Sequence, residues 1–192
     1  MTRPVHVLGF AGSLRAHSLN RALLRAAIEL TPEGLGIEAF DLGPLPLYDG
    51  DVEAAGLPEP VQTFRRRIAA ADALLLVTPE YNYSVPGVLK NAIDWASRPP
   101  DQPFRGKPIA LMGASPGRFG TARAQYHLRQ MCVFLDMLPV NRPEVFISAA
   151  SDKFDPEGRL VDEPARREVR ALLEALLAWT HRLQPTVARP AP

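Results

Sequence analysis

Short apolar runs alternate with longer stretches of mixed polarity along nearly the whole chain. This alternation predicts strands joined by crossover helices, which is the arrangement of a parallel sheet in an α/β fold. The run Ala-Leu-Leu-Leu-Val at 73–77 is apolar at every position, as a strand covered by helices on both sides requires. We therefore expect a three-layer α/β sandwich around a five-stranded parallel sheet. The expected strands are Val5–Ala11, Ile37–Phe40, Ala73–Thr78, Ile109–Ala114 and, approximately, Glu144–Ile147.

Five helices are predicted from the stretches of mixed polarity. They are Leu19–Leu30, Pro60–Ala71, Pro86–Ala96, Thr121–Leu138 and Glu163–Leu183. The last has the clearest apolar stripe at helical spacing, with Asp162 as a cap and Pro164 near its first turn. The segment Asp41–Pro58 is rich in Pro and Gly and longer than a strand-to-helix connection needs. We expect this segment to have a role of its own.

Length and composition are typical of one globular domain. The chain has 192 residues, of which 46% are hydrophobic and 22% charged. We assign residues 1–184 to this domain. Residues 185–192 contain three prolines and few apolar side chains, so we expect this tail to be disordered.

The charge balance argues against a polyanionic partner. Twenty-two basic and 21 acidic side chains give a formal net charge of +1, so we expect no nucleic-acid ligand. The cluster Arg65–Arg67 is interpreted as the solvated face of a helix, with a phosphate contact as the alternative.

Cysteine usage and hydropathy bear on the compartment. The single cysteine, Cys132, allows no intramolecular disulfide, and no Cys/His spacing resembles a zinc site. The first residues lack the features of a signal peptide, and no apolar segment approaches the roughly 20 residues that span a bilayer. We expect a cytoplasmic protein that binds neither a metal nor a membrane.

The loop after the first predicted strand is suited to a phosphate. Ser13, Ser18 and Asn20 offer neutral hydrogen bonds, Arg15 offers a fixed charge, and the following helix offers its N-terminus. The loop lacks the Gly-Lys-Ser/Thr of a nucleoside-triphosphate loop and the Gly-x-Gly-x-x-Gly of a dinucleotide-binding turn. A monophosphate such as that of FMN fits better. The alternative is that Ser18 only caps the helix and Arg15 is a surface charge.

Two further loops should lie at the same edge of the sheet, because ligands in open parallel sheets bind beyond the carboxyl ends of the strands. After the third strand, Tyr81, Asn82 and Tyr83 could border a flat heterocycle. The alternative is a tyrosine-containing turn ahead of an ordinary helix. After the fourth strand, Ser115 and the glycines of residues 113–121 allow a close backbone approach to a ligand.

Two motifs resemble the NADPH-dependent FMN reductase family, in particular its quinone, chromate and azo-compound reductase branch. They are Gly-Ser-Leu-Arg-x-x-Ser-x-Asn at 12–20 and Pro-Glu-Tyr-Asn-x-Ser-x-Pro-x-x-Leu-Lys-Asn-x-Ile-Asp-Trp at 79–95. The resemblance continues to about Leu183. It implies a flavodoxin-like fold with strand order 2-1-3-4-5, non-covalently bound FMN, and homodimers that can pair into homotetramers.

The resemblance also implies roles for individual residues. It assigns the FMN phosphate to Ser13, Arg15, Ser18 and Asn20, and the ring to Pro79, Glu80, Tyr81 and Asn82 with help from Ser115 and Gly117. It places the segment 45–49 at the dimer interface near the partner's flavin. Arg123, Tyr126 and Glu144 are candidates for a polar interface network, with an exposed amphipathic face as the alternative. Thr121 departs from the family pattern, in which a second glycine often follows Gly120.

The implied activity needs no catalytic side chain, because the flavin carries the redox chemistry. We expect a ping-pong reaction in which NADPH or NADH and then a small acceptor, such as a quinone, flavin, azo compound or chromate, occupy one site in turn. A flavodoxin-like carrier that acts through protein partners is the alternative, although such carriers tend to be strongly acidic and this chain is nearly neutral. A nucleotide-binding module without redox function is the third possibility.

Overall fold

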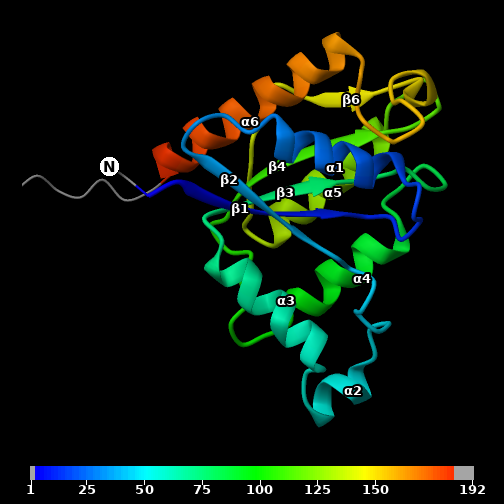
Figure 1. The fold of residues 1–192 in the computed structure, drawn as a ribbon. Helices are drawn as coiled ribbons and strands as arrows, with labels where there is room; N and C mark the ends of the chain where they lie inside the picture. The colour runs from blue at the N-terminus through cyan, green and yellow to red at the C-terminus, as the bar shows by residue number, and fades with distance from the viewer. Residues whose placement is uncertain (1–2, 184–192) are drawn as a thin grey trace, which may run out of the picture.

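A parallel sheet forms the centre of the protein (Figure 1), and the computed structural model describes residues 3–183. Its strands are β1 (Val5–Ala11), β2 (Leu35–Phe40), β3 (Ala73–Val77), β4 (Pro108–Ala114), β5 (Leu138–Pro139) and β6 (Val145–Ile147). They lie in the order β2-β1-β3-β4-β5, with β6 also paired to β4. The predicted α/β fold and the predicted order are confirmed.

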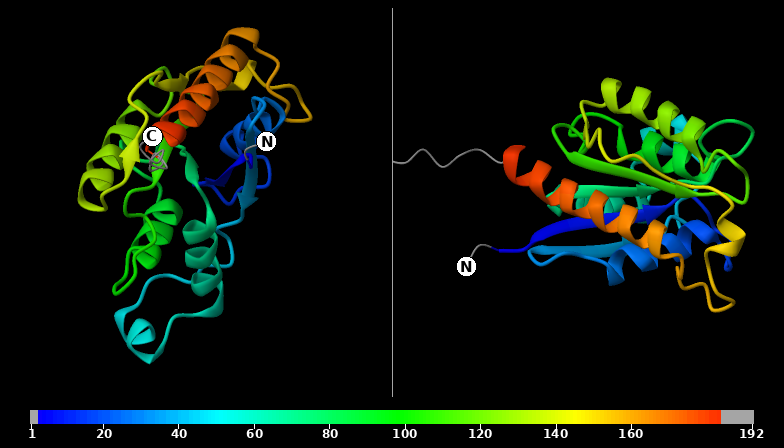
Figure 2. Two further views of the ribbon diagram at one scale, coloured as in Figure 1. Left: turned by 90° about the vertical axis from the view of Figure 1, so that its left-hand side faces the viewer. Right: turned by 90° about the horizontal axis from the view of Figure 1, so that it is seen from above.

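Helices cover both faces of this sheet (Figure 2). They are α1 (Leu19–Glu29), α2 (Gly50–Ala55), α3 (Glu59–Ala70), α4 (Gly87–Ala96), α5 (Ala122–Phe134), the 3-10 turn η1 (Ala150–Asp152) and α6 (Glu163–Leu183). Successive residues of a strand point to opposite faces. Accordingly, Leu75 packs into a core with α1 and α6, whereas Leu74 and Leu76 pack into a second core with α3, α4 and α5. This alternation explains why every residue of β3 is apolar.

The fifth strand position differs from the prediction, because two short strands share it. Leu138 and Pro139 pair with the beginning of β4, and Val145–Ile147 pair with its end. The helix predicted to reach Leu138 instead ends at Phe134. Asp136 adopts a left-handed φ of 53°, and the Met137 N–H donates to the Cys132 carbonyl at 2.9 Å. This C-terminal motif turns the chain back toward the sheet. The residues after Phe134 fit a helical period equally well, but Leu138 and Pro139 pair with β4 instead.

The segment 41–58 contains a helix that the sequence pattern did not predict. The Asp49 carboxylate accepts a hydrogen bond from the Asp51 N–H and caps α2, and Gly56 ends the helix with a φ of 124°. No residue of α2 is buried, so the helix has no apolar stripe that a periodicity could reveal.

Three other predictions concern the extent of the domain, the C-terminal tail and membrane-spanning segments. The assignment of residues 1–184 to one domain stays a prediction, and the proline-rich tail 185–192 lies outside the described residues. Among residues 3–183, no helix is both long and apolar enough to cross a membrane.

Candidate functional site

Three loops meet at the carboxyl edge of the central strands. They follow β1, β3 and β4, which are neighbours in the sheet. The helix after β1 packs on one face and the helix after β3 packs on the other. The winding therefore reverses between β1 and β3, and at such a switch point the diverging connections leave a crevice for a ligand.

The first loop, residues 12–18, presents unpaired backbone donors. Among residues 3–183, the N–H groups of 13–17 have no acceptor, whereas those of Gly12 and Ser18 are bonded to backbone carbonyls. The Ser18 hydroxyl accepts from the Asn20 and Arg21 N–H groups at 3.2 and 3.3 Å and so caps α1. A run of free amides beside a helix N-terminus is suited to an anion. The side chain of Arg15, the predicted charged contact, is exposed beside these amides.

The structure gives Asn20 partners that the sequence did not indicate. Its side-chain amide is buried and is hydrogen-bonded to the backbone of Ala114, at the end of β4. This contact ties the start of α1 to the strand that leads into the third loop. Asn20 is therefore in a position to support the first loop, and its predicted contact with a phosphate stays a prediction.

The second loop forms a tight hairpin at residues 81–84. Tyr81 and Ser84 exchange two backbone hydrogen bonds of 3.0 Å. Asn82 and Tyr83, the two central residues, have φ values of 50° and 66°, as in a type I′ turn. Left-handed φ values at residues other than glycine cost of the order of 1 kcal/mol or more each and are concentrated at functional sites. Tyr81 and Tyr83 are 48% and 69% exposed, so both rings are accessible from solvent.

The carboxylate of Glu80 points away from solvent and toward α5. It accepts hydrogen bonds from the N–H groups of Arg123 and Ala124 at 3.0 and 3.3 Å and forms an ion pair with the Arg123 guanidinium. The side chain of Thr121, the residue that precedes α5, makes no capping hydrogen bond. The Glu80 carboxylate caps the helix instead. The carboxylate is thus occupied, and Glu80 offers a ligand mainly its backbone. The Arg123 guanidinium also donates a hydrogen bond to the Glu80 carboxylate, and this bond together with the attraction between the two charges raises the pKa of Arg123 above its ordinary value.

The third loop, residues 115–121, is attached to the neighbouring strand and turn. The Ser115 N–H donates to the Ile147 carbonyl at 2.9 Å, and the Ser115 carbonyl accepts from the Ala150 N–H at 3.0 Å. The Ser115 hydroxyl accepts from the Gly117 N–H at 3.1 Å. The predicted residues Ser115 and Gly117 therefore lie in a loop with defined geometry, and Gly117 is exposed.

Thr121, where the family resemblance leads us to expect a second glycine, has a φ of 77°. Glycine adopts this conformation with less strain, which explains why a second glycine suits the position. Here the Thr121 side chain is buried and its hydroxyl accepts a hydrogen bond from the Gln125 amide at 3.1 Å. The threonine thus gains a hydrogen bond at a strained backbone position.

The predicted interface residues have partners within the same chain. Arg123 forms the ion pair with the second loop, and a carboxylate oxygen of Glu144 lies 3.7 Å from a guanidinium nitrogen of Arg142. The rings of Tyr126 and Phe146 pack at a centroid distance of 6.1 Å with an interplanar angle of 65°. Their participation in a subunit interface stays a prediction.

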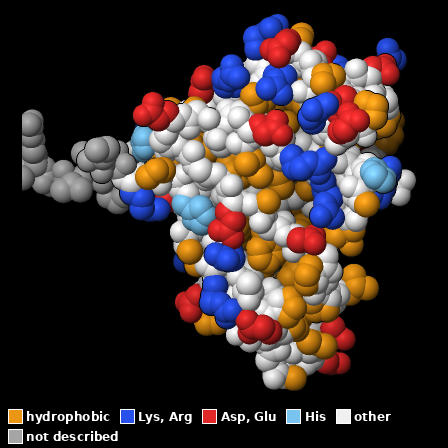
Figure 3. Space-filling view, in the orientation of Figure 1, with side chains coloured by type: hydrophobic (Ala, Val, Ile, Leu, Met, Phe, Trp, Pro, Cys, Tyr) orange, Lys and Arg blue, Asp and Glu red, His pale blue; other side chains and the backbone are white. Residues whose placement is uncertain are grey.

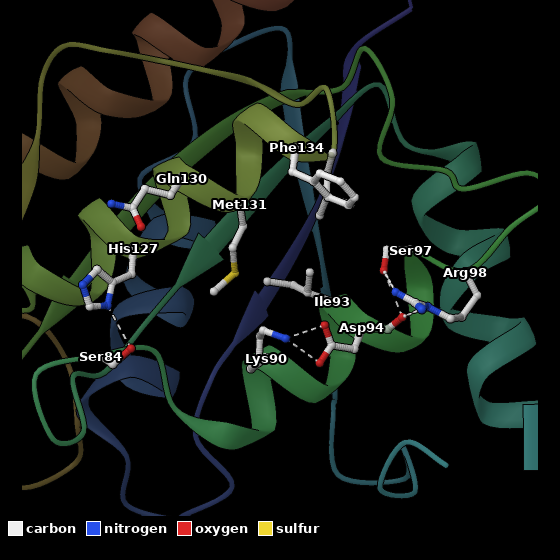
Figure 4. Close-up of a pocket in the computed structure, with 11 residues that line it drawn as sticks. Ser84, Lys90, Ile93, Asp94, Ser97, Arg98, His127, Gln130, Met131 and Phe134 are labelled. Atoms are coloured by element: carbon white, nitrogen blue, oxygen red, sulfur yellow. Dashed lines mark hydrogen bonds and ion pairs between the residues drawn. The ribbon is translucent and has the colours of Figure 1, made fainter. Parts of the chain in front are cut away.

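A cavity of about 520 Å³ lies between α4 and α5 (Figure 4). It adjoins the second loop at Ser84, whose hydroxyl oxygen is 2.9 Å from Nδ1 of His127.

The sequence did not predict the contact between Ser84 and His127 or the ion pair between Glu80 and Arg123. His127 follows Arg123 by four positions, which predicts a shared helix face but not what that face contacts. Among residues 3–183, no group of three or more His, Cys, Asp and Glu side chains could hold a metal ion.

The model of the NADPH-dependent FMN reductase family matches residues 5–152. The chain belongs to this family. It is 59% identical over 184 residues to an NAD(P)H-dependent FMN reductase of Pseudomonas aeruginosa, covering 96% of this chain and 100% of the relative. It is 48% identical over 186 residues to an NADPH:quinone oxidoreductase of Arabidopsis thaliana, covering 94% of each chain. It is 41% identical over 187 residues to a quinone reductase of Escherichia coli K12, covering 96% and 100%.

A solved structure agrees with the sequence relatives. A flavoenzyme NAD(P)H:(acceptor) oxidoreductase of Paracoccus denitrificans superposes with a TM-score of 0.84 at 36% identity, covering 93% of this chain and 98% of the other. The predicted family and oxidoreductase class are confirmed, as are FMN and a reduced nicotinamide as the molecules that the family uses. In this FMN reductase family member, the free amides of residues 13–17 fit a phosphate group.

Proposed function

We propose that this protein is an FMN-dependent oxidoreductase that passes electrons from NADPH or NADH to quinones and to similar small acceptors such as flavins, azo compounds and chromate. The observation that carries the proposal is the meeting, at one switch point, of five unpaired amides with a hairpin that exposes two tyrosines. The names of the Arabidopsis thaliana and Escherichia coli relatives favour quinones among these acceptors.

The first loop would hold the phosphate of FMN. The amides of residues 13–17 would donate hydrogen bonds, and the hydroxyls of Ser13 and Ser18 would add neutral ones. The Arg15 guanidinium would supply a charge-assisted bond with a forked geometry that suits phosphate oxygens. Asn20 would contribute by holding the start of α1 against Ala114.

The second and third loops would hold the ring. Pro79 and Glu80 would meet it through their backbone, Tyr81 would border one face, and Asn82 would approach its polar edge. Ser115 and Gly117 would complete the enclosure from the third loop. FMN supplies the hydride transfer when it is bound, so the protein's own residues bind the ring, orient it and limit the access of water.

The nicotinamide and the acceptor would use the same open face in turn, because the chain contains no second nucleotide-binding motif. Initial rates at several fixed acceptor concentrations should therefore give parallel double-reciprocal lines. Intersecting lines would contradict this ping-pong order.

One anaerobic experiment separates the possible functions. Purified protein is titrated with FMN and then mixed with NADPH under nitrogen, and the flavin absorbance is followed. Rapid loss of the flavin absorbance, followed by its recovery when a quinone is added, supports the enzyme. FMN that binds but keeps its colour supports an electron carrier that acts through protein partners, and failure to bind FMN supports a nucleotide-binding module without redox function.

A homodimer or homotetramer is part of the proposal. The segment 41–58 projects from the body, and hydrophobic side chains gather in this lower part of the molecule (Figure 3). Leu47 is 84% exposed, and Val52 is exposed as well. The Pro46 carbonyl accepts from Asn91 and Trp95 of α4 at 2.8 and 2.9 Å, so the projecting segment is anchored. An exposed apolar surface of this kind favours a partner. Light scattering tests this by comparing the molar mass of Leu47→Glu in solution with that of the unaltered protein.

The compartment is also proposed. Cys132 is buried, and burial raises the pKa of its thiol to about 11. A single inert thiol is consistent with the reducing cytoplasm.

A further inference from the structure

The hairpin at 81–84 contacts α5 at both of its ends. At the start, the Glu80 carboxylate binds the Arg123 and Ala124 N–H groups and the Arg123 guanidinium. At the end, the Ser84 hydroxyl lies 2.9 Å from Nδ1 of His127, and the two side chains face each other across the gap between the hairpin and α5 (Figure 4).

The tip of the hairpin contacts the same helix. The Arg123 guanidinium lies over the Tyr83 ring at 3.6 Å from its centroid, and over the Phe119 ring of the third loop at 4.6 Å. Cations are attracted to the faces of aromatic rings. One side chain of α5 therefore links the second loop with the third.

The hairpin needs such support. Its own turn is closed by two backbone hydrogen bonds, and both central residues have left-handed φ values without being glycine. Conformations of this kind persist only when surrounding contacts fix them. Arg123 and His127 supply those contacts from one face of α5, because residues four apart lie above each other on a helix.

The ion pair at the start of the hairpin is well shielded. The Glu80 side chain is only 7% exposed, and that of Arg123 is 33% exposed. A carboxylate with so little access to water depends on its partners. Loss of the guanidinium would leave Glu80 bound to the amides of α5 alone, and it would also remove the contact with the Tyr83 ring.

We propose that Arg123 and His127 are positioning residues that hold the 81–84 hairpin in the conformation that binds the flavin ring. This proposal rests on the proposed function, since it concerns the ring end of the same site. It gives Arg123 a role within one subunit, in addition to any contact with a second copy.

Riboflavin distinguishes the two ends of the site, because it carries the ring but no phosphate. Apoprotein would be titrated with FMN and with riboflavin by flavin fluorescence. We expect Arg123→Ala to weaken both ligands by the same factor, about tenfold, which corresponds to about 1.4 kcal/mol. We expect a smaller and again equal loss for His127→Leu. His127→Gln, which keeps a hydrogen-bonding group toward Ser84, should recover most of the affinity.

The matched control is Gln130→Ala on the same helix, at an exposed position, and it should leave both affinities within about twofold. A merely structural role would lower the melting temperature of the apoprotein and leave the affinities unchanged, and that result would overturn the proposal. If Arg123→Ala does not fold, the comparison of His127→Leu with His127→Gln decides the question alone.

A second measurement covers the case in which riboflavin binds too weakly to titrate. The midpoint potential of bound FMN would be determined at saturating FMN, where a displaced hairpin changes the ring's surroundings and a weaker phosphate contact does not. A shift for His127→Leu but not for His127→Gln supports the proposal, and equal potentials contradict it. If the unaltered protein binds neither flavin, the proposed function itself is wrong.

Discussion

The side-chain amide of Asn20 pairs with the backbone of Ala114 through two hydrogen bonds of 2.9 Å, one in each direction. Asn20 belongs to the first turn of α1, and Ala114 is the last residue of β4. The pair joins the connection after β1 to the connection after β4. Two of the three loops of the proposed flavin site are therefore connected by one buried side chain.

Replacement of this side chain should be costly. Asn20→Ala leaves the buried N–H and carbonyl of Ala114 without partners, so we expect the free energy of unfolding to fall by about 2 to 4 kcal/mol. Urea unfolding of the apoprotein measures it. Asn141→Ala, at an exposed position, is the control and should change stability by less than about 0.5 kcal/mol. Equal effects of the two variants would contradict a structural role for Asn20.

Arg15→Ala should weaken FMN but not riboflavin. The lost charge-assisted contact with the phosphate corresponds to about 1.5 to 3 kcal/mol of binding free energy. Isothermal titration of the apoprotein with each flavin gives the two affinities. Arg105→Ala removes an equal charge at an exposed position before β4 and should leave FMN binding unchanged. An unaltered FMN affinity in Arg15→Ala would refute the phosphate contact.

Gly113 of β4 has no room for a methyl group. A Cβ at this position would overlap the Thr121 hydroxyl and the Thr78 carbonyl. We expect Gly113→Ala to lower the unfolding free energy by about 1 to 3 kcal/mol, as overpacking does, and to displace the third loop. Gly36→Ala is the matched control, because no atom of residues 3–183 lies within 4 Å of its added Cβ. Thermal unfolding that is the same for both variants would count against this packing.

Asp72 should make the free energy of unfolding depend on pH. Burial opposes its ionisation, but the His6 N–H and the Arg3 guanidinium, each at 2.8 Å, outweigh burial and lower the pKa of Asp72. The folded-state pKa lies below that of the unfolded chain, so the stabilisation is complete above about pH 4 and is lost as the pH falls through the folded-state pKa.

Asp72→Asn should therefore reduce the unfolding free energy by about 1 kcal/mol at pH 7, and the difference from the unaltered protein should narrow below about pH 4. Urea unfolding at several pH values measures both. Arg3→Ala removes only the exposed partner and should cost less than about 0.5 kcal/mol. A difference that stays constant down to pH 3 would exclude the carboxylate as its source.

Most of the fold could be predicted from the sequence, because hydrophobic periodicity is a local property. The bounds predicted for β1 and α6 agree with the structure. The prediction failed at α2, which buries nothing, and at the end of α5, where an apolar run fits a helix and a strand equally well. Only pairing with β4 decided the second case.

The sequence by itself determined the strand and helix order, the three loops and the family, because these depend on residue types at short spacing. The tertiary structure alone decided how the loops are held. Asn20 meets Ala114 across 94 positions of sequence, and Glu80 meets Arg123 across 43. Such contacts depend on the packing of α1 and α5 against opposite faces of the sheet. A pattern along the chain does not contain that information, since the energy of a hydrogen bond depends on which groups the fold brings within reach.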